Sequence, residues 1–486
     1  MVFISKPQTL VVELLSHIFL ECLPKSSLVQ LKSNEAPLNV SQVCRYWRNV
    51  SLSTRRLWTR LRVLCLDDGT ALEYTLPALH AFLDRSGSAD FRVEFTTPST
   101  NHTNSSPGHP HPLPPMRWET LQVLLTELSN HHQRTKSITL SLSETLAENA
   151  TTFVLGQFHD LDHLSLRCHT RTGPYERPTN IRLTDVFWAT LSQLSSLDLA
   201  CTLDLFLNVG EIQKLHRLRH LSLNIMNVEL YPYLLNACPA LETLRINPKY
   251  RISPPNGLHN PLPEIRILTS LRNLEIVWNG YTWPFPDILS ELNLKCPQLR
   301  RLEVIRFPTS MNPNPILTLV TKSQPPLEEL SLTRFSGGND MEVINILTHL
   351  PNLRVLRVKI SHAILRALVL PSTYGPSNGA KGTCPLLEEI TLEIGDMAFE
   401  ESIIVWSETE DMVRSRWLSP SKQRRGNAQL TTSENKPGAT FSPYKELRRV
   451  NLPDIMECYW KRHQLYKCLK DCQKQGLVIG FGEECD

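Results

Sequence analysis

The six residues Leu299-Arg-Arg-Leu-Glu-Val304 show the unit that repeats along most of this chain. In each copy two aliphatic residues flank one polar residue, the alternation of a short strand with one buried face. A third aliphatic residue, usually leucine, precedes them and is expected to fill the turn before the strand. Ten copies in one frame are too many for a chance clustering of leucines in an ordinary α/β domain. The leading residues of the ten copies are Leu161, Leu194, Leu218, Leu241, Leu271, Leu299, Leu327, Leu353, Leu387 and Leu447.

Stretches with helical spacing separate the copies, for example residues 232–238 and 341–350. Most copies begin at intervals near the roughly 20–29 residues expected of leucine-rich repeats, and some intervals are longer. The sequence therefore predicts an α/β fold: a leucine-rich-repeat solenoid, or horseshoe, with parallel strands on its concave face and helices outside. Less regular copies are expected to extend the array upstream, at residues 61–63, 91–95 and 138–140.

Two insertions are expected to interrupt the array, at residues 96–115 and 407–443. Both are rich in small polar residues and proline, and their apolar content is too low for packing, which predicts mobile loops outside the solenoid. At the C-terminus, Asp454 and Glu457 resemble a capping box. They predict a closing helix that ends at Gly476, a suitable C-cap residue, followed by a last strand.

The N-terminal residues have helical spacing instead. Leu10, Leu14 and Ile18 lie four residues apart, and Leu15 and Phe19 widen this apolar stripe. The pattern is typical of an amphipathic helix.

Two further short helices are expected. The second helix begins with residues 37–47, and the third is a short segment over residues 52–58. Three short helices are too small to be stable alone, so we expect them to pack on the solenoid, on a partner, or on both. The chain is accordingly divided into an N-terminal all-α module, residues 1–64, and the solenoid, residues 65–486.

Two stretches of this module are similar to an F-box: Leu10-Val-Val-Glu-Leu-Leu-Ser-His-Ile-Phe-Leu-Glu-Cys-Leu-Pro24 and Val40-Ser-Gln-Val-Cys-Arg-Tyr-Trp-Arg-Asn-Val-Ser-Leu-Ser-Thr-Arg-Arg-Leu-Trp58. The resemblance covers residues 10–62 and is greatest to the F-box-like proteins of mushroom-forming fungi. Leucine-rich repeats behind the box are the arrangement usual in that family. One departure is that F-boxes usually begin Leu-Pro-x-Glu, whereas Val11 and Val12 stand here, so the proline that presets a first helical turn is missing.

The resemblance implies a non-catalytic substrate-recognition subunit of an SCF-type cullin–RING ubiquitin ligase, without a cofactor. The module would bind the Skp-type adaptor, and through it a cullin, while the repeats bind an unidentified protein substrate. The alternative is a repeat scaffold without a ligase role, in which the helices are a self-packed cap. The expected adaptor contacts are Leu10, Leu14, Leu15, Ile18, Phe19, Val40, Val43, Trp47 and Trp58.

Six arginines between residues 45 and 62 have no acid among them. They suit an acidic partner surface, or they form an ordinary solvated basic face.

The substrate is expected on the concave face, where the polar residues of successive strands stack into one surface. The charges there have both signs, which favours a protein partner over nucleic acid. An aromatic cluster follows one strand at residues 278–285; it supplies typical binding anchors, or it covers the underside of that repeat. The candidate substrate-binding residues are Arg245, Trp278, Tyr281, Trp283, Arg301 and Arg357.

Several other functions find no support in the sequence. The net charge of +3 is too small to indicate binding to nucleic acid or to an anionic membrane, and no apolar run is long enough for a membrane span. Motifs for nucleotide binding, zinc proteases and serine hydrolases are missing. The expected location is therefore the cytoplasm or the nucleus, with reduced cysteines.

The cysteines leave two alternatives open. Cys238, Cys296 and Cys384 each precede a proline just before a repeat, and we interpret them as small buried thiols; a cysteine-based enzyme would need a low-pKa thiol beside a cation. Cys468 and Cys472 lie one helical turn apart, which allows half a zinc site, although the interior of a helix is the better explanation.

Overall fold

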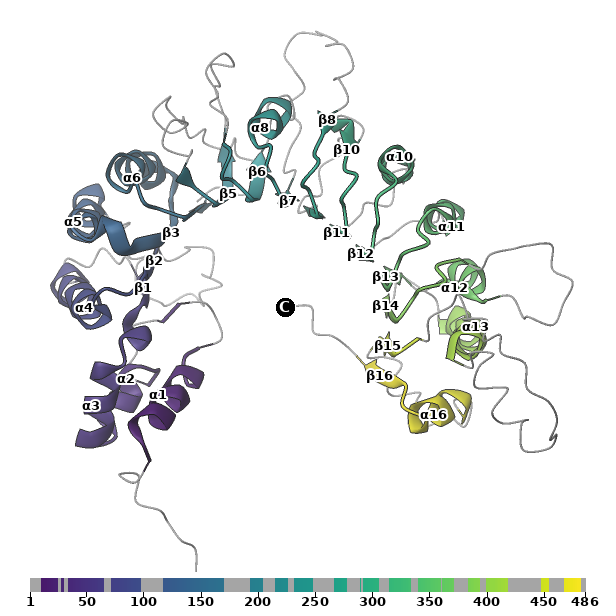
Figure 1. Cartoon of the computed structure of the whole chain (residues 1–486), viewed down its shortest axis with the longest axis horizontal. Helices are drawn as coiled ribbons and strands as arrows, with labels where there is room; N and C mark the ends of the chain where they lie inside the picture. Colours follow the sequence, from purple (N-terminus) through teal and green to yellow (C-terminus); the bar gives the residue numbers. More distant parts are fainter. Residues whose placement is uncertain are drawn as a thin grey trace, which may run out of the picture. The chain divides into compact units, whose positions relative to one another are not determined.

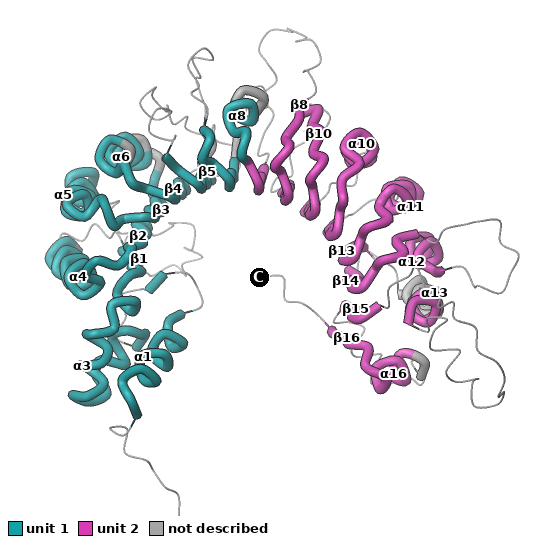
Figure 2. Tube along the Cα trace, in the orientation of Figure 1, with its two compact units in different colours: residues 1–240 teal, residues 241–486 magenta. Residues whose placement is uncertain are grey.

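The structure is a computed structural model, and it describes about three fifths of the chain in separate stretches. These are residues 10–24, 28–29, 34–64, 71–97, 117–169, 193–203, 215–225, 231–247, 266–277, 289, 292–305, 314–333, 340–359, 361–370, 383–393, 399–417, 447–453 and 467–481. The chain forms two compact units, Met1–Ala240 and Leu241–Asp486 (Figure 2).

The first unit contains parallel strands that neighbour one another in the order of the sequence. They are β1 (Arg60–Leu64), β2 (Phe91–Thr96), β3 (Thr135–Ser143), β4 (His163–His169), β5 (Ser196–Leu203) and β6 (His220–Ile225).

The helices of the first unit form two groups. The N-terminal group comprises α1 (Val12–Glu21), α2 (Leu38–Gln42), α3 (Arg45–Ser53) and the 3-10 helix η2 (Arg55–Trp58). The other helices lie between the strands in sequence and on one side of them in space (Figure 1); they are α4 (Ala71–Ser86), α5 (Trp118–Ser129), the 3-10 helix η4 (His132–Arg134), α6 (Glu144–Gln157) and α8 (Tyr231–Ala237).

The second unit repeats this construction with β7 (Thr243–Ile246), β9 (Asn273–Val277), β11 (Arg301–Ile305), β12 (Glu329–Thr333), β13 (Val355–Lys359), β14 (Glu389–Glu393), β15 (Arg449–Leu452) and β16 (Val478–Phe481), again parallel and in sequence order. A second pair of parallel strands is β8 (Arg266–Ile267) with β10 (Leu294–Lys295). The helices described in the second unit are α10 (Asn314–Ser323), α11 (Asp340–Thr348), α12 (His362–Leu368), α13 (Phe399–Trp417) and α16 (Lys467–Lys474).

The prediction of a mixed α/β fold with parallel strands and intervening helices is confirmed. In all ten copies the two aliphatic residues around the central polar residue lie in a strand. The ten leading leucines are buried, none more than 2% exposed. They and the strand residues form the core between the strands and the helices, and the polar strand residues lie on the opposite, helix-free face of each unit.

One backbone hydrogen-bond pattern recurs from repeat to repeat. The carbonyl of the residue before the strand accepts two successive amides of the next repeat at β4, β5, β7, β9, β11, β12, β13 and β14. For example, Arg272 O accepts from Arg300 N at 2.8 Å and from Arg301 N at 3.0 Å, and Arg300 O accepts from Glu328 N and Glu329 N in the same way. Because these copies supply the same donors and acceptors, the strands align in parallel without a change of register over β9, β11 and β12.

The prediction for residues 407–443 is wrong over its first part, because residues 407–417 belong to helix α13. Met412, Val413 and Trp417 bury their side chains, so this part of the stretch packs against the protein. Residues 418–443, and residues 98–115 of the other insertion, lie outside the described residues.

The C-terminal helix ends as expected. Gly476 has φ +107°, in the left-handed region that favours glycine. Leu477 N donates to Cys472 O and Gly476 N donates to Gln473 O, both at 3.0 Å, which is a Schellman motif. The chain then enters β16, the expected last strand; Asp454 and Glu457 lie outside the described residues.

The division between the compact units does not coincide with the expected boundary at residue 64. Strand β1 begins at Arg60, and the helical module packs on the first repeat. The rings of Trp58 and Phe82 meet edge to face at 5.0 Å, and the Arg85 guanidinium lies 4.3 Å above the Trp58 ring. Arg62 N donates to Val29 O at 2.7 Å, so residues before the second helix cover part of the outer edge of β1.

Candidate protein-binding surfaces

Helix α1 is apolar on two faces, of which only one is packed. Leu15 and Phe19, four residues apart, are completely buried. Val11, Leu14 and Ile18 follow one another at three- and four-residue spacing on another face, and they are 61%, 49% and 39% exposed. Val12 is exposed as well. The exposed set Val11, Leu14 and Ile18 is called the α1 stripe below.

The buried face of α1 packs on α3. The rings of Phe19 and Trp47 lie 5.0 Å apart, and the hydroxyls of Ser16 and Thr54 share a 3.0 Å hydrogen bond. No side chain caps the start of α1 at Val11. The Tyr46 hydroxyl donates instead to the carbonyl of Leu10 at 2.7 Å, which anchors the chain as it enters the helix.

The nine expected adaptor-contact residues separate into three groups. Leu14, Ile18 and Val43 are exposed, and Leu10 and Trp47 are partly exposed. Four others are buried inside the protein and hold the exposed ones in place: Leu15, Phe19, Val40 and Trp58. The expectation that Leu15 belongs to the exposed stripe is therefore wrong.

Successive residues on a helix point about 100° apart, and here Leu15 lies on the packed face with Phe19 whereas Leu14 lies on the exposed face. Val11, Val12 and Leu52, which were not among the expected contacts, are also exposed apolar side chains of the same module.

The helix expected to start over residues 37–47 is broken in two. Helix α2 ends at Gln42, and Cys44 is extended at φ −158° and ψ 173°. Its Sγ accepts from Trp47 N at 3.5 Å, so Cys44 is the N-cap of α3. A thiol is a weak acceptor, and for this reason the break has no strong sequence signal.

Five of the six arginines in the basic stretch are exposed, namely Arg45, Arg48, Arg55, Arg56 and Arg60. Within the described stretches of the chain none of these five forms an ion pair with an acid. Arg62 differs, since its Nε lies 2.7 Å from the Glu94 carboxylate on the neighbouring strand. The basic stretch is thus mostly open to a partner, and one of its members stabilises the sheet instead.

The expected substrate residues of the second unit lie on the helix-free face. Arg301 and Arg357 come from strands two apart, β11 and β13, with β12 between them. Arg301 contacts Glu303 at 2.9 Å and Glu329 at 3.6 Å, and Arg245 contacts Glu275 at 3.3 Å. The Glu303 hydrogen bond raises the pKa of Arg301. Trp278, Tyr281 and Trp283 lie outside the described residues.

The helix-free face of the first unit carries hydroxyl and imidazole groups. His163 Nδ1 lies 2.8 Å from Ser196 Oγ, and Ser165 Oγ donates to Asp198 at 2.9 Å. Arg167 also contacts Asp198, at 3.5 Å. Burial lowers the pKa of His163, and Asp198 opposes this shift.

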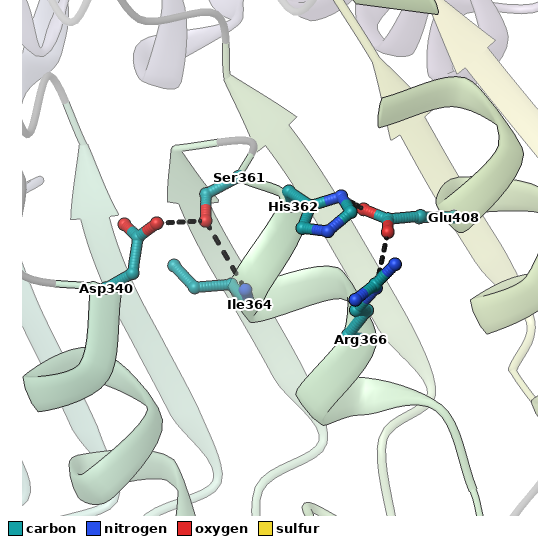
Figure 3. A network of polar contacts seen from close by, with 6 residues as sticks. All are labelled: Asp340, Ser361, His362, Ile364, Arg366 and Glu408. Carbon is teal, nitrogen blue, oxygen red and sulfur yellow. Dashed lines mark hydrogen bonds and ion pairs between the residues drawn. The ribbon is translucent and has the colours of Figure 1, made fainter. Parts of the chain in front are cut away.

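A second polar network lies between helices α11, α12 and α13 (Figure 3). Ser361 Oγ accepts from Ile364 N as the N-cap of α12 and donates to Asp340 at 2.6 Å. His362 and Arg366 contact the two oxygens of the buried Glu408 carboxylate. The network contains the residue types of a catalytic triad, but Ser361 and His362 contact different carboxylates. These contacts therefore stabilise the packing of the three helices.

The three cysteines before prolines are buried, as interpreted from the sequence. Burial raises the pKa of Cys238, Cys296 and Cys384 to about 12. They are therefore thiols at neutral pH, and thiols are poor nucleophiles. Among the described residues no group of three or more His, Cys, Asp or Glu side chains has the arrangement of a metal site.

No protein-family model matches this chain, and no curated protein matches its sequence. Within the described part of the chain no helix is both long and apolar enough to cross a membrane.

Proposed function

We propose that this protein is a non-catalytic substrate-recognition subunit of an SCF-type cullin–RING ubiquitin ligase. The N-terminal helices bind the Skp-type adaptor as an F-box does, and the leucine-rich repeats bind a protein substrate. Such a subunit acts by raising the effective concentration of the substrate near the ubiquitin-conjugating enzyme.

The observation that carries the proposal is the α1 stripe. Val11, Leu14 and Ile18 are exposed although the same helix buries Leu15 and Phe19 on another face. An aliphatic side chain gains about 1.5–3 kcal/mol when it is fully buried, so several such side chains on one short helix indicate an interface. The stripe falls in the part of the chain that resembles an F-box, and exposed arginines follow it in sequence.

A second candidate function is a repeat scaffold whose N-terminal helices only cap the first repeat. The contact between Trp58 and Phe82 and the Val29–Arg62 hydrogen bond favour it, because repeat arrays need terminal caps to cover their core. Capping leaves the α1 stripe exposed, whereas adaptor binding covers it, and this difference separates the two functions.

The test is capture of the purified Skp-type adaptor by the full chain carrying Leu14→Asp and Ile18→Asp. Loss of about 1.5 kcal/mol at each position should weaken capture roughly 100-fold. Leu15 is unsuitable for this test because it is completely buried, and a charge there would unfold the module.

A matched control carries Val123→Asp and Met341→Asp, which change two exposed apolar side chains on α5 and α11. Both variants should unfold at the same temperature as the wild type, and the control should capture the adaptor normally. Equal capture by the stripe variant and the wild type, or no capture by either, would leave the scaffold as the better function.

A further inference from the structure

The helix-free faces of the two units differ in charge. In the second unit five basic residues are matched by five acidic ones, and ion pairs join Arg245 to Glu275 and Arg301 to Glu329 across neighbouring strands. In the first unit four arginines, Arg60, Arg62, Arg92 and Arg167, meet only two acids, Glu94 and Asp198, on β1 to β6. The basic residues of the second-unit face are Arg245, Arg301, Arg357, Lys359 and Arg449, and the acidic ones are Glu275, Glu303, Glu329, Glu389 and Glu393.

Arg60 and Arg92 carry the excess charge. They are register partners on β1 and β2, and neighbouring strands lie only about 4.7–4.9 Å apart. Both side chains are exposed. Arg62 has Glu94 and Arg167 has Asp198, but neither Arg60 nor Arg92 has an acidic partner among the described residues. Like charges in register destabilise a sheet, so an anion placed between them would relieve this repulsion.

Hydroxyl groups continue the surface beyond the arginines. Ser137 and Thr139 of β3 are register partners of Arg92 and Glu94, and both are partly exposed. They can donate to carboxylates or bond to the backbone of a bound chain. The outward positions described on β1 to β6 include no Phe, Tyr or Trp, the side chains on which nucleic-acid bases stack.

We propose that this face binds an acidic segment, rich in aspartate and glutamate, of a protein partner. Under the proposed function, on which this identification rests, the partner is the ubiquitination substrate. Arg60 and Arg167 are three strand spacings apart across the sheet, roughly 14 Å, and four residues apart along the strands, roughly 13 Å, which gives a separation of roughly 19 Å. That is the length of about six residues of extended chain. The charges are thus spread along a line, as suits an extended acidic peptide, and do not converge on one point.

The test uses the full chain and a fluorescein-labelled peptide of about ten residues in which glutamate alternates with serine, so that an extended chain presents the carboxylates on one side. A glutamine–serine peptide is the neutral control. Fluorescence anisotropy should show that the acidic peptide binds at least about tenfold more tightly than the neutral one, and that added salt weakens binding.

Arg60→Glu with Arg92→Glu should weaken acidic-peptide binding at least about tenfold. The control with the same change in net charge is Lys322→Glu with Lys474→Glu, two exposed residues on α10 and α16; it should bind the peptide like the wild type. If the double glutamate variant does not fold, Arg60→Gln with Arg92→Gln replaces it, with a smaller loss expected.

Equal binding of the acidic and neutral peptides, or unchanged affinity in the arginine variants, would overturn the proposal. So would tighter binding of a mixed-sequence single-stranded oligonucleotide than of the acidic peptide, because the surface would then be a nucleic-acid site. Adaptor capture is measured on the same arginine variants. If the wild type captures the adaptor but does not bind the acidic peptide, only this inference is contradicted, whereas failure of the wild type to capture the adaptor contradicts the proposed function.

Discussion

Among single residues, Arg416 of α13 is unusual because it is 1% exposed and yet a cation. Its guanidinium donates to three backbone carbonyls: Leu368 O at 2.8 Å, Cys384 O at 2.8 Å and Thr383 O at 2.6 Å. Burial lowers its pKa to about 10, so it remains protonated at neutral pH. Arg416 thereby caps the end of α12 and holds α13 on the second unit.

Arg416→Ala should lower the free energy of unfolding by about 3 kcal/mol or more, because it removes three hydrogen bonds from a buried guanidinium to backbone carbonyls. Chemical denaturation of the full chain measures this. The control is Arg448→Ala: the Arg448 side chain is 76% exposed and contacts Glu388 at 3.7 Å, a surface pair whose loss should cost less than about 1 kcal/mol. Equal losses in both variants would show that Arg416 does not hold the helix.

His163 makes the stability of the first unit depend on pH. Burial lowers its pKa, and Arg92, Arg167 and His220 act in the same direction. The unfolded chain therefore binds a proton at this histidine more tightly than the folded chain. It follows that stability is greatest above pH 6.5, the ordinary value, and falls as the pH drops below it.

The measurement is the unfolding temperature at about pH 7.5 and about pH 5. His163→Gln should lose less stability on acidification than the wild type. Substitution of the exposed His159 is the control and should leave the acid-induced loss as it is. An identical acid-induced loss in the His163 variant would contradict the assignment.

Among the strands, β16 shows a packing constraint that its neighbour imposes. A Cβ on Gly480 would lie 2.6 Å from the Asn451 side-chain oxygen. Asn451 is the register partner of Gly480 on β15, and its amide donates to Thr391 Oγ1 on β14 at 3.1 Å. The glycine thus leaves room for a polar side chain that links two strands.

Gly480→Ala should destabilise the protein by about 1–3 kcal/mol, the cost of overpacking. In an Asn451→Ala background the same change should cost clearly less, because the obstructing oxygen is gone. A double-mutant cycle by thermal or chemical unfolding measures the coupling. Equal costs in the two backgrounds would mean that Asn451 does not restrict position 480.

The strands were predictable from sequence and several helices were not, for physical reasons. In a strand, the alternation of apolar and polar residues predicts which side chains are buried, as it does for Leu302 and Val304. Helix α13 was missed because its buried face includes Thr409 and Arg416, which count as polar in a sequence although hydrogen bonds satisfy the arginine. The exposed face of α1 was only half identified, since a sequence shows that Leu14 and Leu15 are apolar but not which one has a partner.

At the level of the whole molecule, the chain combines an array of stacked repeats with a helical module that is apolar on two sides. Each repeat contributes a buried leading leucine to the core. In most repeats a pair of amide hydrogen bonds also joins the repeat to the one before it. The α1 stripe has no counterpart in that pattern, because α1 uses Leu15 and Phe19 for internal packing. A partner that covers the stripe is therefore the simplest explanation of its composition.

Amide hydrogen exchange of the full chain, with and without the purified Skp-type adaptor, tests this explanation most directly. We predict a complex in which exchange slows across α1, Val12–Glu21, while β11 to β13 exchange as in the unbound chain. Val123→Asp with Met341→Asp should leave this protection in place, and Leu14→Asp with Ile18→Asp should remove it. Absence of a complex, or protection that leaves α1 unchanged, would contradict the assignment of the N-terminal helices as the adaptor-binding module.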